Sequence, residues 1–195
     1  MPRWARAVLA AGVLALGSLY AAPLWHIGLT APQYPEGLGL FIGIDRITGE
    51  KPQDLQSING LNHYIGMKEI VPASFPELRY MPILLGVLIG TGLIVAAWGN
   101  RRALYAWTAL FALGAAAGLV DLWRWGHDYG HDLNPRAAIK IPGMSYQPPV
   151  IGGKQLLNFH ADSWPALGGW VAILVLSLAV ALAVREWISA RARSA

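Results

Sequence analysis

The chain has 195 residues, of which 55% are hydrophobic and 13% are charged, and its formal net charge is +4. A mean hydropathy of +0.41 excludes an ordinary soluble domain. The basic residues gather where apolar runs end instead of forming one basic face, which excludes a typical nucleic-acid-binding protein.

Four apolar stretches are long enough to cross a membrane, which takes roughly 20 helical residues. We predict transmembrane helices at about 7–25, 80–100, 103–124 and 163–184. The predicted fold class is an all-α membrane protein, a single domain over 1–195. Two structured outer loops, 26–79 and 125–162, are expected to form a small α+β cap. The first stretch has a basic start like a signal peptide, but Tyr20 and Pro23 give a poor cleavage pattern, so we expect a retained helix.

The distribution of charge predicts the orientation. The segments at one end of the four helices carry seven basic residues and one acid, whereas the two long loops carry eight basic residues and ten acids. Lys and Arg are enriched on the cytoplasmic side of membrane proteins. The sequence therefore predicts a multi-pass protein of a bacterial inner membrane, with both termini in the cytoplasm and both loops in the periplasm.

Glycines mark two features of the predicted helices. A tight turn at Gly99 and Asn100 is expected to make the second and third helices antiparallel neighbours. Two further pairs have the small-xxx-small spacing that lets membrane helices approach closely, Gly86/Gly90 and Gly114/Gly118. The spacing is common by chance, so it predicts no particular partner.

The first outer loop has two periodic segments. Apolar residues alternate along 37–48, which is typical of a strand. A helix start follows near Pro52, after which apolar residues recur at helical spacing. On that helix, residues four apart are neighbours, so Asn59, His63 and Met67 are expected to share one face.

The second outer loop opens with a polar flank that continues the third helix. His127 and His131 are four residues apart and would lie on one helix face. Three acids nearby could accept the second ring N–H of an imidazole and so orient it: Asp121, Asp128 and Asp132.

These donors suggest a metal site. All five histidines and every methionine except the first belong to the predicted outer face, and cysteine is absent. Imidazole with thioether suits copper, above all Cu(I). The predicted metal ligands are His63, Met67, His127, His131 and Met144. Further ligands or orienting groups are expected among His26, His160, Asp121, Asp128, Asp132 and Asn59.

The predicted function is periplasm-facing copper binding, for delivery to or insertion into a partner metalloenzyme or respiratory complex in the periplasm or membrane. No catalytic motif is visible, so we expect no enzyme activity. One alternative is a non-catalytic membrane subunit or assembly factor that docks through its Trp- and Pro-rich loops. Another is haem b held between His26 and His127 or His131. The same residues can also have structural roles without any metal. Met often fills packing gaps, and a His at a membrane boundary is often simply a hydrogen-bonded polar residue.

Three segments carry a resemblance: Ala31 to Leu38, Ile58 to Met67 and Pro142 to Pro149. They resemble a poorly characterised family of small four-helix bacterial membrane proteins, which is associated with accessory genes for nitrous-oxide reductase and copper handling. The resemblance covers nearly the whole chain. It implies a copper-related task in the periplasm but supplies no set of ligands.

Overall fold

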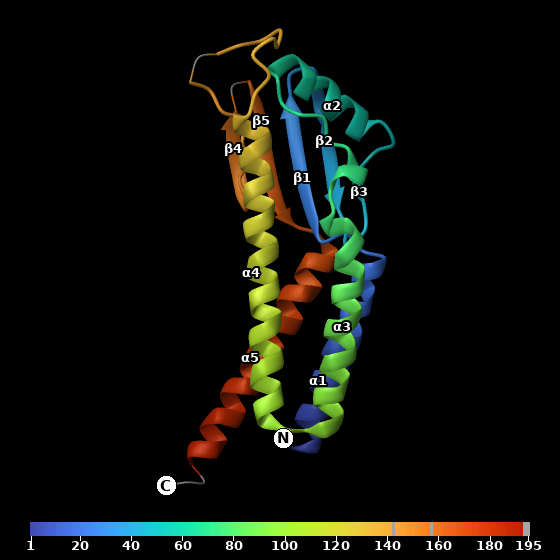
Figure 1. Cartoon of the computed structure of the whole chain (residues 1–195), viewed down its shortest axis with the longest axis vertical. Helices are drawn as coiled ribbons and strands as arrows, with labels where there is room; N and C mark the ends of the chain where they lie inside the picture. The colour runs from blue at the N-terminus through green and yellow to red at the C-terminus, as the bar shows by residue number, and fades with distance from the viewer. Residues whose placement is uncertain (142, 157, 193–195) are drawn as a thin grey trace.

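The computed structural model describes residues 1–141, 143–156 and 158–192. Figure 1 shows a layer of long helices that carries a β-sheet with one further helix at one end. The sheet and its helix form a unit that we call the cap. The N-terminus and the C-terminal end of the last helix both lie at the opposite end of the helical layer from the cap (Figure 1).

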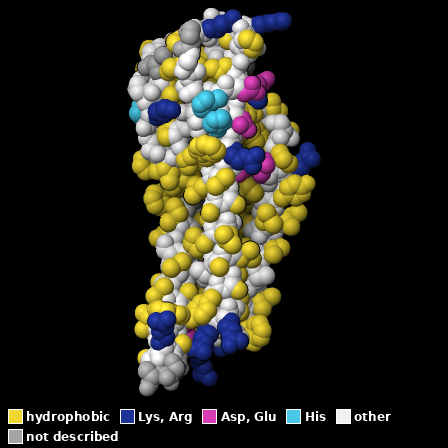
Figure 2. All heavy atoms as spheres, turned by 60° about the vertical axis from the view of Figure 1, so that its left-hand side comes forward, with side chains coloured by type: hydrophobic (Ala, Val, Ile, Leu, Met, Phe, Trp, Pro, Cys, Tyr) yellow, Lys and Arg dark blue, Asp and Glu magenta, His cyan; other side chains and the backbone are white. Residues whose placement is uncertain are grey.

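Three helices are long and apolar enough to cross a membrane: α3 (Glu77–Trp98), α4 (Arg101–His131) and α5 (Leu167–Arg191). Figure 2 shows a wide hydrophobic band over these helices, with Lys and Arg side chains beyond both of its ends. Within the described residues, the length and composition of these three helices are compatible with a membrane protein. The predicted spans at 80–100 and 103–124 correspond to α3 and α4, and the span at 163–184 begins four residues before α5.

The prediction of an all-α protein with four spans is wrong. The stretch 7–25 does not form one long helix. It contains most of α1 (Arg3–Ala15), then the 3-10 helix η1 (Leu16–Tyr20), and its last residue begins a strand. The Ser18 hydroxyl bonds to the Ala15 carbonyl, and the Ser18 carbonyl accepts from two later amides, which closes the chain into a turn.

The core of the helical layer lies around α1. Ala5, Leu9 and Val13 recur every four residues and are at most 1% exposed, so they form one buried stripe. This stripe packs against α3 and α5, in one cluster with Trp107 and Phe111 of α4. One face of the short helix is thus covered by longer helices, while Trp4 and Leu14 on its other side are exposed.

The tight turn between α3 and α4 is confirmed. Gly99 has a φ of 72°, a left-handed conformation that favours glycine at a helix end. The side chain of Asn100 then accepts from the backbone amides of Arg102 and Ala103, which caps the start of α4.

The cap is built on a five-stranded antiparallel sheet with the order β3-β2-β1-β5-β4. Its strands come from both outer loops: β1 (Trp25–Ala31), β2 (Tyr34–Ile42), β3 (Ile47–Gly49), β4 (Gly152–Leu156) and β5 (Phe159–Pro165). The two loops meet where β1 pairs with β5, with His26 opposite Trp164 and Thr30 opposite His160. The strand-like segment predicted at 37–48 covers the end of β2, a turn at 43–46 and the start of β3.

The two faces of the sheet differ because side chains alternate along a strand. Ile27, Leu29 and Ala31 of β1 face one side, where the single cap helix α2 (Asp54–Ile65) and the outer end of α4 cover them. His26 and Thr30 face the other side. The covered face contains a small apolar core of Leu40, Ile47 and Ile70.

The predicted helix after Pro52 is confirmed, but its end is not where the spacing suggested. Asp54 is 3% exposed and its carboxylate accepts from the backbone amides of Gly39 and Lys51, which attaches the start of α2 to β2. Gly66 ends the helix with a φ of 83°. The segment after it includes the short 3-10 helix η2 (Pro72–Ser74) and leads into α3.

Candidate functional site

The pair His63 and Met67 does not form the predicted two-donor face. His63 is an exposed residue of α2, with its ring 6.2 Å from that of Tyr64. Met67 lies beyond Gly66, where the helix has already ended, and its side chain lines a cavity under the sheet. The spacing of four residues places neighbours together only inside a helix, and the turn at Gly66 removes that condition.

His127 and His131 do lie together. Their rings are stacked, with centroids 4.1 Å apart and planes inclined by 16°. The His131 Nδ1 is 3.0 Å from the His127 carbonyl oxygen, which can only accept, so Nδ1 carries the proton and donates. In the neutral imidazole, the Nε2 of His131 then keeps its lone pair, which is the form that binds a metal.

The remaining predicted donors lie on separate parts of the cap. Met144 is half-buried in the segment after α4, and its amide donates to Ile141. His26 on β1 has its Nε2 3.2 Å from Glu50, on the sheet face opposite α2. His160 is exposed on β5, opposite Gln155 of β4, and its ring lies next to Gly153.

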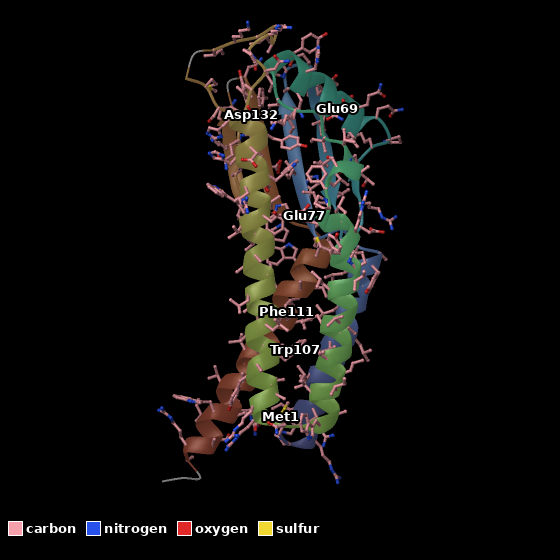
Figure 3. The ribbon with its side chains drawn as sticks, viewed as in Figure 1. Met1, Glu69, Glu77, Trp107, Phe111 and Asp132 are labelled. Atoms are coloured by element: carbon pink, nitrogen blue, oxygen red, sulfur yellow. The ribbon has the colours of Figure 1, made fainter. Side chains whose placement is uncertain are left out.

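Two of the expected orienting groups are engaged elsewhere. The amide of Asn59 accepts from the Ile70 N–H at 2.8 Å and donates to the Ile70 carbonyl at 3.1 Å, so it braces the chain. Asp132 forms an ion pair of 2.7 Å with Lys68 and, through this hydrogen bond, raises the pKa of that lysine above its ordinary value. Figure 3 labels Asp132 at the outer end of α4.

The other two acids lie on α4. Asp128 lies beside a predicted ligand, with its Oδ1 3.6 Å from Nδ1 of His127. Asp121 is exposed two turns nearer the membrane. Among residues 1–141, 143–156 and 158–192, no three His, Cys, Asp or Glu side chains are grouped closely enough to hold one metal ion.

The cap contains a cavity of about 380 Å³. It lies between the covered face of the sheet, helix α2 and the outer end of α4. Apolar and aromatic side chains form most of its wall, and no charged side chain contributes to it. Its main lining residues are Ile27, Leu29, Ala161, Tyr64, Met67, Trp125, Tyr129, Tyr146 and Phe159.

Two polar atoms of this wall have no hydrogen-bond partner. They are Nε1 of Trp125 and the hydroxyl of Tyr146, and both atoms are shielded from the surface. Tyr146 as a whole is only 2% exposed. A buried polar group without a partner costs about 1–3 kcal/mol, so natural proteins rarely leave one.

A glycine face on α4 positions Tyr146. Gly126 and Gly130 are buried, and the segment Tyr146 to Pro148 lies directly on them. A side chain at Gly130 would overlap the backbone of Gln147, and the amide of Tyr146 donates to the Gly130 carbonyl at 2.9 Å. The close approach of these two backbones places the tyrosine ring inside the cap.

A second part of the same loop covers the end of α2. The amide of Asn134 donates to the carbonyl of Gly66 at 2.8 Å, and the amide of Ile139 donates to that of Tyr64 at 2.9 Å. The loop after α4 therefore forms the part of the cavity wall that neither the sheet nor a helix supplies.

The sequence contained partial signals for this site. Trp125 and Tyr129 are four residues apart on a helix, and their rings are 5.1 Å apart in the structure. The alternation in 37–48 marked one strand of the wall. No local sequence pattern predicted the strands β1 and β5. Their inward residues line the cavity only because the two strands pair.

No protein-family model and no curated protein sequence matches this chain. The resemblance to a copper-associated membrane family therefore stays a prediction.

Proposed function

We propose that the cap binds a neutral, apolar small molecule that carries a hydrogen-bond acceptor. The single observation that carries this proposal is the cavity of about 380 Å³ with two unpaired buried donors in its wall. Ligand pockets typically measure 300–1,000 Å³ and are mostly apolar with a few placed polar groups. Protein interiors otherwise contain few voids larger than a water molecule.

The wall indicates which chemistry fits. Burial of a charge without a partner is strongly unfavourable, and no charged side chain lines the cavity. The indole N–H of Trp125 can only donate, and the phenol of Tyr146 can donate. A neutral ligand with a carbonyl oxygen would satisfy such groups. The rings of Tyr129 and Phe159 favour a flat ligand body.

The proposal includes the orientation predicted from the charges. The cap would face the periplasm of a bacterial inner membrane, and both termini would face the cytoplasm. In support, both chain ends lie at one end of the helical layer (Figure 1), and Arg side chains cluster there. A cavity next to the outer membrane surface is well placed for a molecule that partitions into lipid.

Binding of the naphthalene ketone prodan to the protein in lipid nanodiscs tests this proposal. Prodan is neutral and flat, carries one carbonyl acceptor, and reports hydrogen bonding through its emission. We expect saturable binding that Ala161→Phe abolishes, because Ala161 is 2% exposed and lines the cavity. Tyr146→Phe should weaken binding by about tenfold, the equivalent of one hydrogen bond.

Thr30→Phe is the matched control for the cavity-filling variant. It places the same ring on the opposite, exposed face of the sheet and should leave prodan binding unchanged. The absence of saturable binding in the wild-type protein, or an equal loss in both variants, would contradict the proposal.

A second candidate function rests on the stacked pair His127 and His131. We propose that their two Nε2 atoms bind one Cu(I) ion at the cap surface, for transfer to a partner metalloenzyme that completes the coordination. The separation of 4.1 Å between the ring centroids and the proton on Nδ1 of His131 support a two-donor clip. Because the two ring planes are nearly parallel, one imidazole must turn about its side-chain torsions to direct both Nε2 lone pairs at one ion. The exposure of His127 would allow stepwise exchange of ligands with a partner.

Titration of Cu(I) into the protein separates this clip from the five-donor site that the sequence suggested. The affinity should fall in His127→Gln and in His131→Gln, and it should stay unchanged in His63→Gln and Met67→Leu. An equal loss in all four variants would favour the five-donor site instead. No measurable Cu(I) binding would remove the copper function.

A further inference from the structure

One face of α4 passes from the cavity into the membrane layer. Trp107 and Trp125 are 18 residues apart, which is five helical turns at 3.6 residues each. The same separation joins Phe111 and Tyr129, so these four aromatic residues lie on one face of a helix that is continuous from Arg101 to His131. Figure 3 labels Trp107 and Phe111 between α4 and α3.

The two ends of this face are covered. At the inner end, Trp107 is 3% exposed and its Nε1 donates to the Leu88 carbonyl of α3 at 3.0 Å, and Phe111 is 7% exposed. At the outer end, Trp125 lies in the cavity wall and packs on Phe75, with ring centroids 5.9 Å apart.

The stretch between these ends is uncovered. All residues in 113–121 are exposed, although this part of α4 lies between two packed regions of the same helix. Gly114 and Gly118 point within about 20° of the direction of Trp125, at 100° per residue. A methyl group added at either glycine would find no heavy atom within 4 Å.

Resting on the proposed function, we infer that the ligand is a lipid with its head in the cap cavity and its apolar chain along this face of α4. The chain would lie on Gly114 and Gly118 and end above Phe111. The distance along the helix from Phe111 to Trp125 is about 21 Å, at 1.5 Å per residue. The helix is apolar from Phe111 to Val120, and the charged residues Asp121 and Arg124 follow just before Trp125. The ligand would therefore come from the bilayer.

Two independent features support this ligand. The first is the continuity of the uncovered face with the cavity, since Trp125 lies only one turn beyond Asp121 on the same helix. The second is the unpaired hydroxyl of Tyr146, which is 98% buried and belongs to the cavity wall. A head group with an acceptor would bind there, while glycines leave the most space for a chain next to the helix.

The test compares two dyes with one head group, prodan and its dodecanoyl analogue laurdan, in the same nanodiscs. Gly114→Leu and Gly118→Leu should weaken laurdan binding by about tenfold, because a side chain takes the place of the tail. Both variants should bind prodan as the wild type does. The control is Ala116→Leu, which adds the same bulk on the opposite face of α4 and should change neither dye.

Each result has a distinct meaning. Selective loss of laurdan in the two glycine variants supports a tail on α4. Equal binding of laurdan by all variants, with prodan also bound, overturns the lipid inference and leaves the cavity function intact. A glycine variant that changes the oligomeric state without changing laurdan binding assigns this face to a second copy and also overturns the inference. Failure of the wild-type protein to bind either dye contradicts the cavity function itself.

Discussion

The side chain of Asn59 holds both backbone polar groups of Ile70, accepting from its N–H at 2.8 Å and donating to its carbonyl at 3.1 Å. This pair of hydrogen bonds, which we call the Asn59 bracket, connects α2 to the segment that leads into α3. It lies beside the cavity because Ile70 is one of the lining residues. A residue expected to orient a metal ligand therefore has a structural role.

We expect Asn59→Ala to destabilise the cap by about 1–3 kcal/mol, since it leaves two backbone groups of a 5%-exposed residue without partners. Amide hydrogen exchange should show faster exchange across 66–76. Gln56→Ala on the exposed side of the same helix is the control and should leave exchange unchanged. Equal protection in both variants would show that the bracket does not stabilise the cap.

Gly130 and Gly126 provide a matched pair for the loop that carries Tyr146. A Cβ at Gly130 would lie 2.6 Å from the Gln147 Cα, whereas one at Gly126 would meet only side-chain atoms at 3.8 Å. Gly130→Ala should therefore lower the free energy of unfolding by about 1–3 kcal/mol through overpacking. Gly126→Ala should be neutral or stabilise by up to about 1 kcal/mol, because Ala favours helix. Thermal unfolding in detergent measures both, and equal midpoints would contradict the close contact.

Gly92 and Gly90 give a similar comparison inside the helical layer. A Cβ at Gly92 would lie 2.8 Å from both the Trp107 ring and Val13, and a Cβ at Gly90 would meet nothing within 4 Å. Gly92→Ala should destabilise the contact of α3 with α4 by about 1–3 kcal/mol, and Gly90→Ala should not. The midpoint of thermal unfolding in detergent is a suitable measurement. A destabilised Gly90→Ala variant would reveal a neighbour outside this chain.

The ion pair of Lys68 with Asp132 makes a pH prediction. Because the hydrogen bond to Asp132 raises the pKa of Lys68, the pair stabilises the folded cap from neutral pH up to the ordinary lysine value of about 10.4, and this contribution is lost as the pH rises through the raised value. Both side chains are about half exposed or more, so salt should weaken the effect. An NMR titration of the lysine side chain should show a lower pKa for Lys68 in Asp132→Asn. An unchanged value would show that the pair does not form in solution.

Parts of the candidate site were predictable where a local pattern sufficed. The neighbourhood of His127 and His131 follows from helical spacing, because α4 runs unbroken through both residues. The expected pair of His63 with Met67 failed for a local reason as well, since Gly66 adopts a left-handed conformation and ends α2 between them. The spacing was the same in both pairs, and only the length of the helix differed.

The sequence by itself determined the three long apolar helices, the turn at Gly99 and Asn100, and the start of α2, because hydrophobic runs, caps and helical periodicity act over a few residues. Only the tertiary structure decided that the first apolar run stops short and that β1 joins β5 across more than 120 residues of chain. Strand pairing depends on contacts between distant segments, and short strands such as β1 and β4 carry little pattern of their own. The cavity, with Trp125 and Tyr146 in its wall, exists only once those strands have paired beneath α2 and α4.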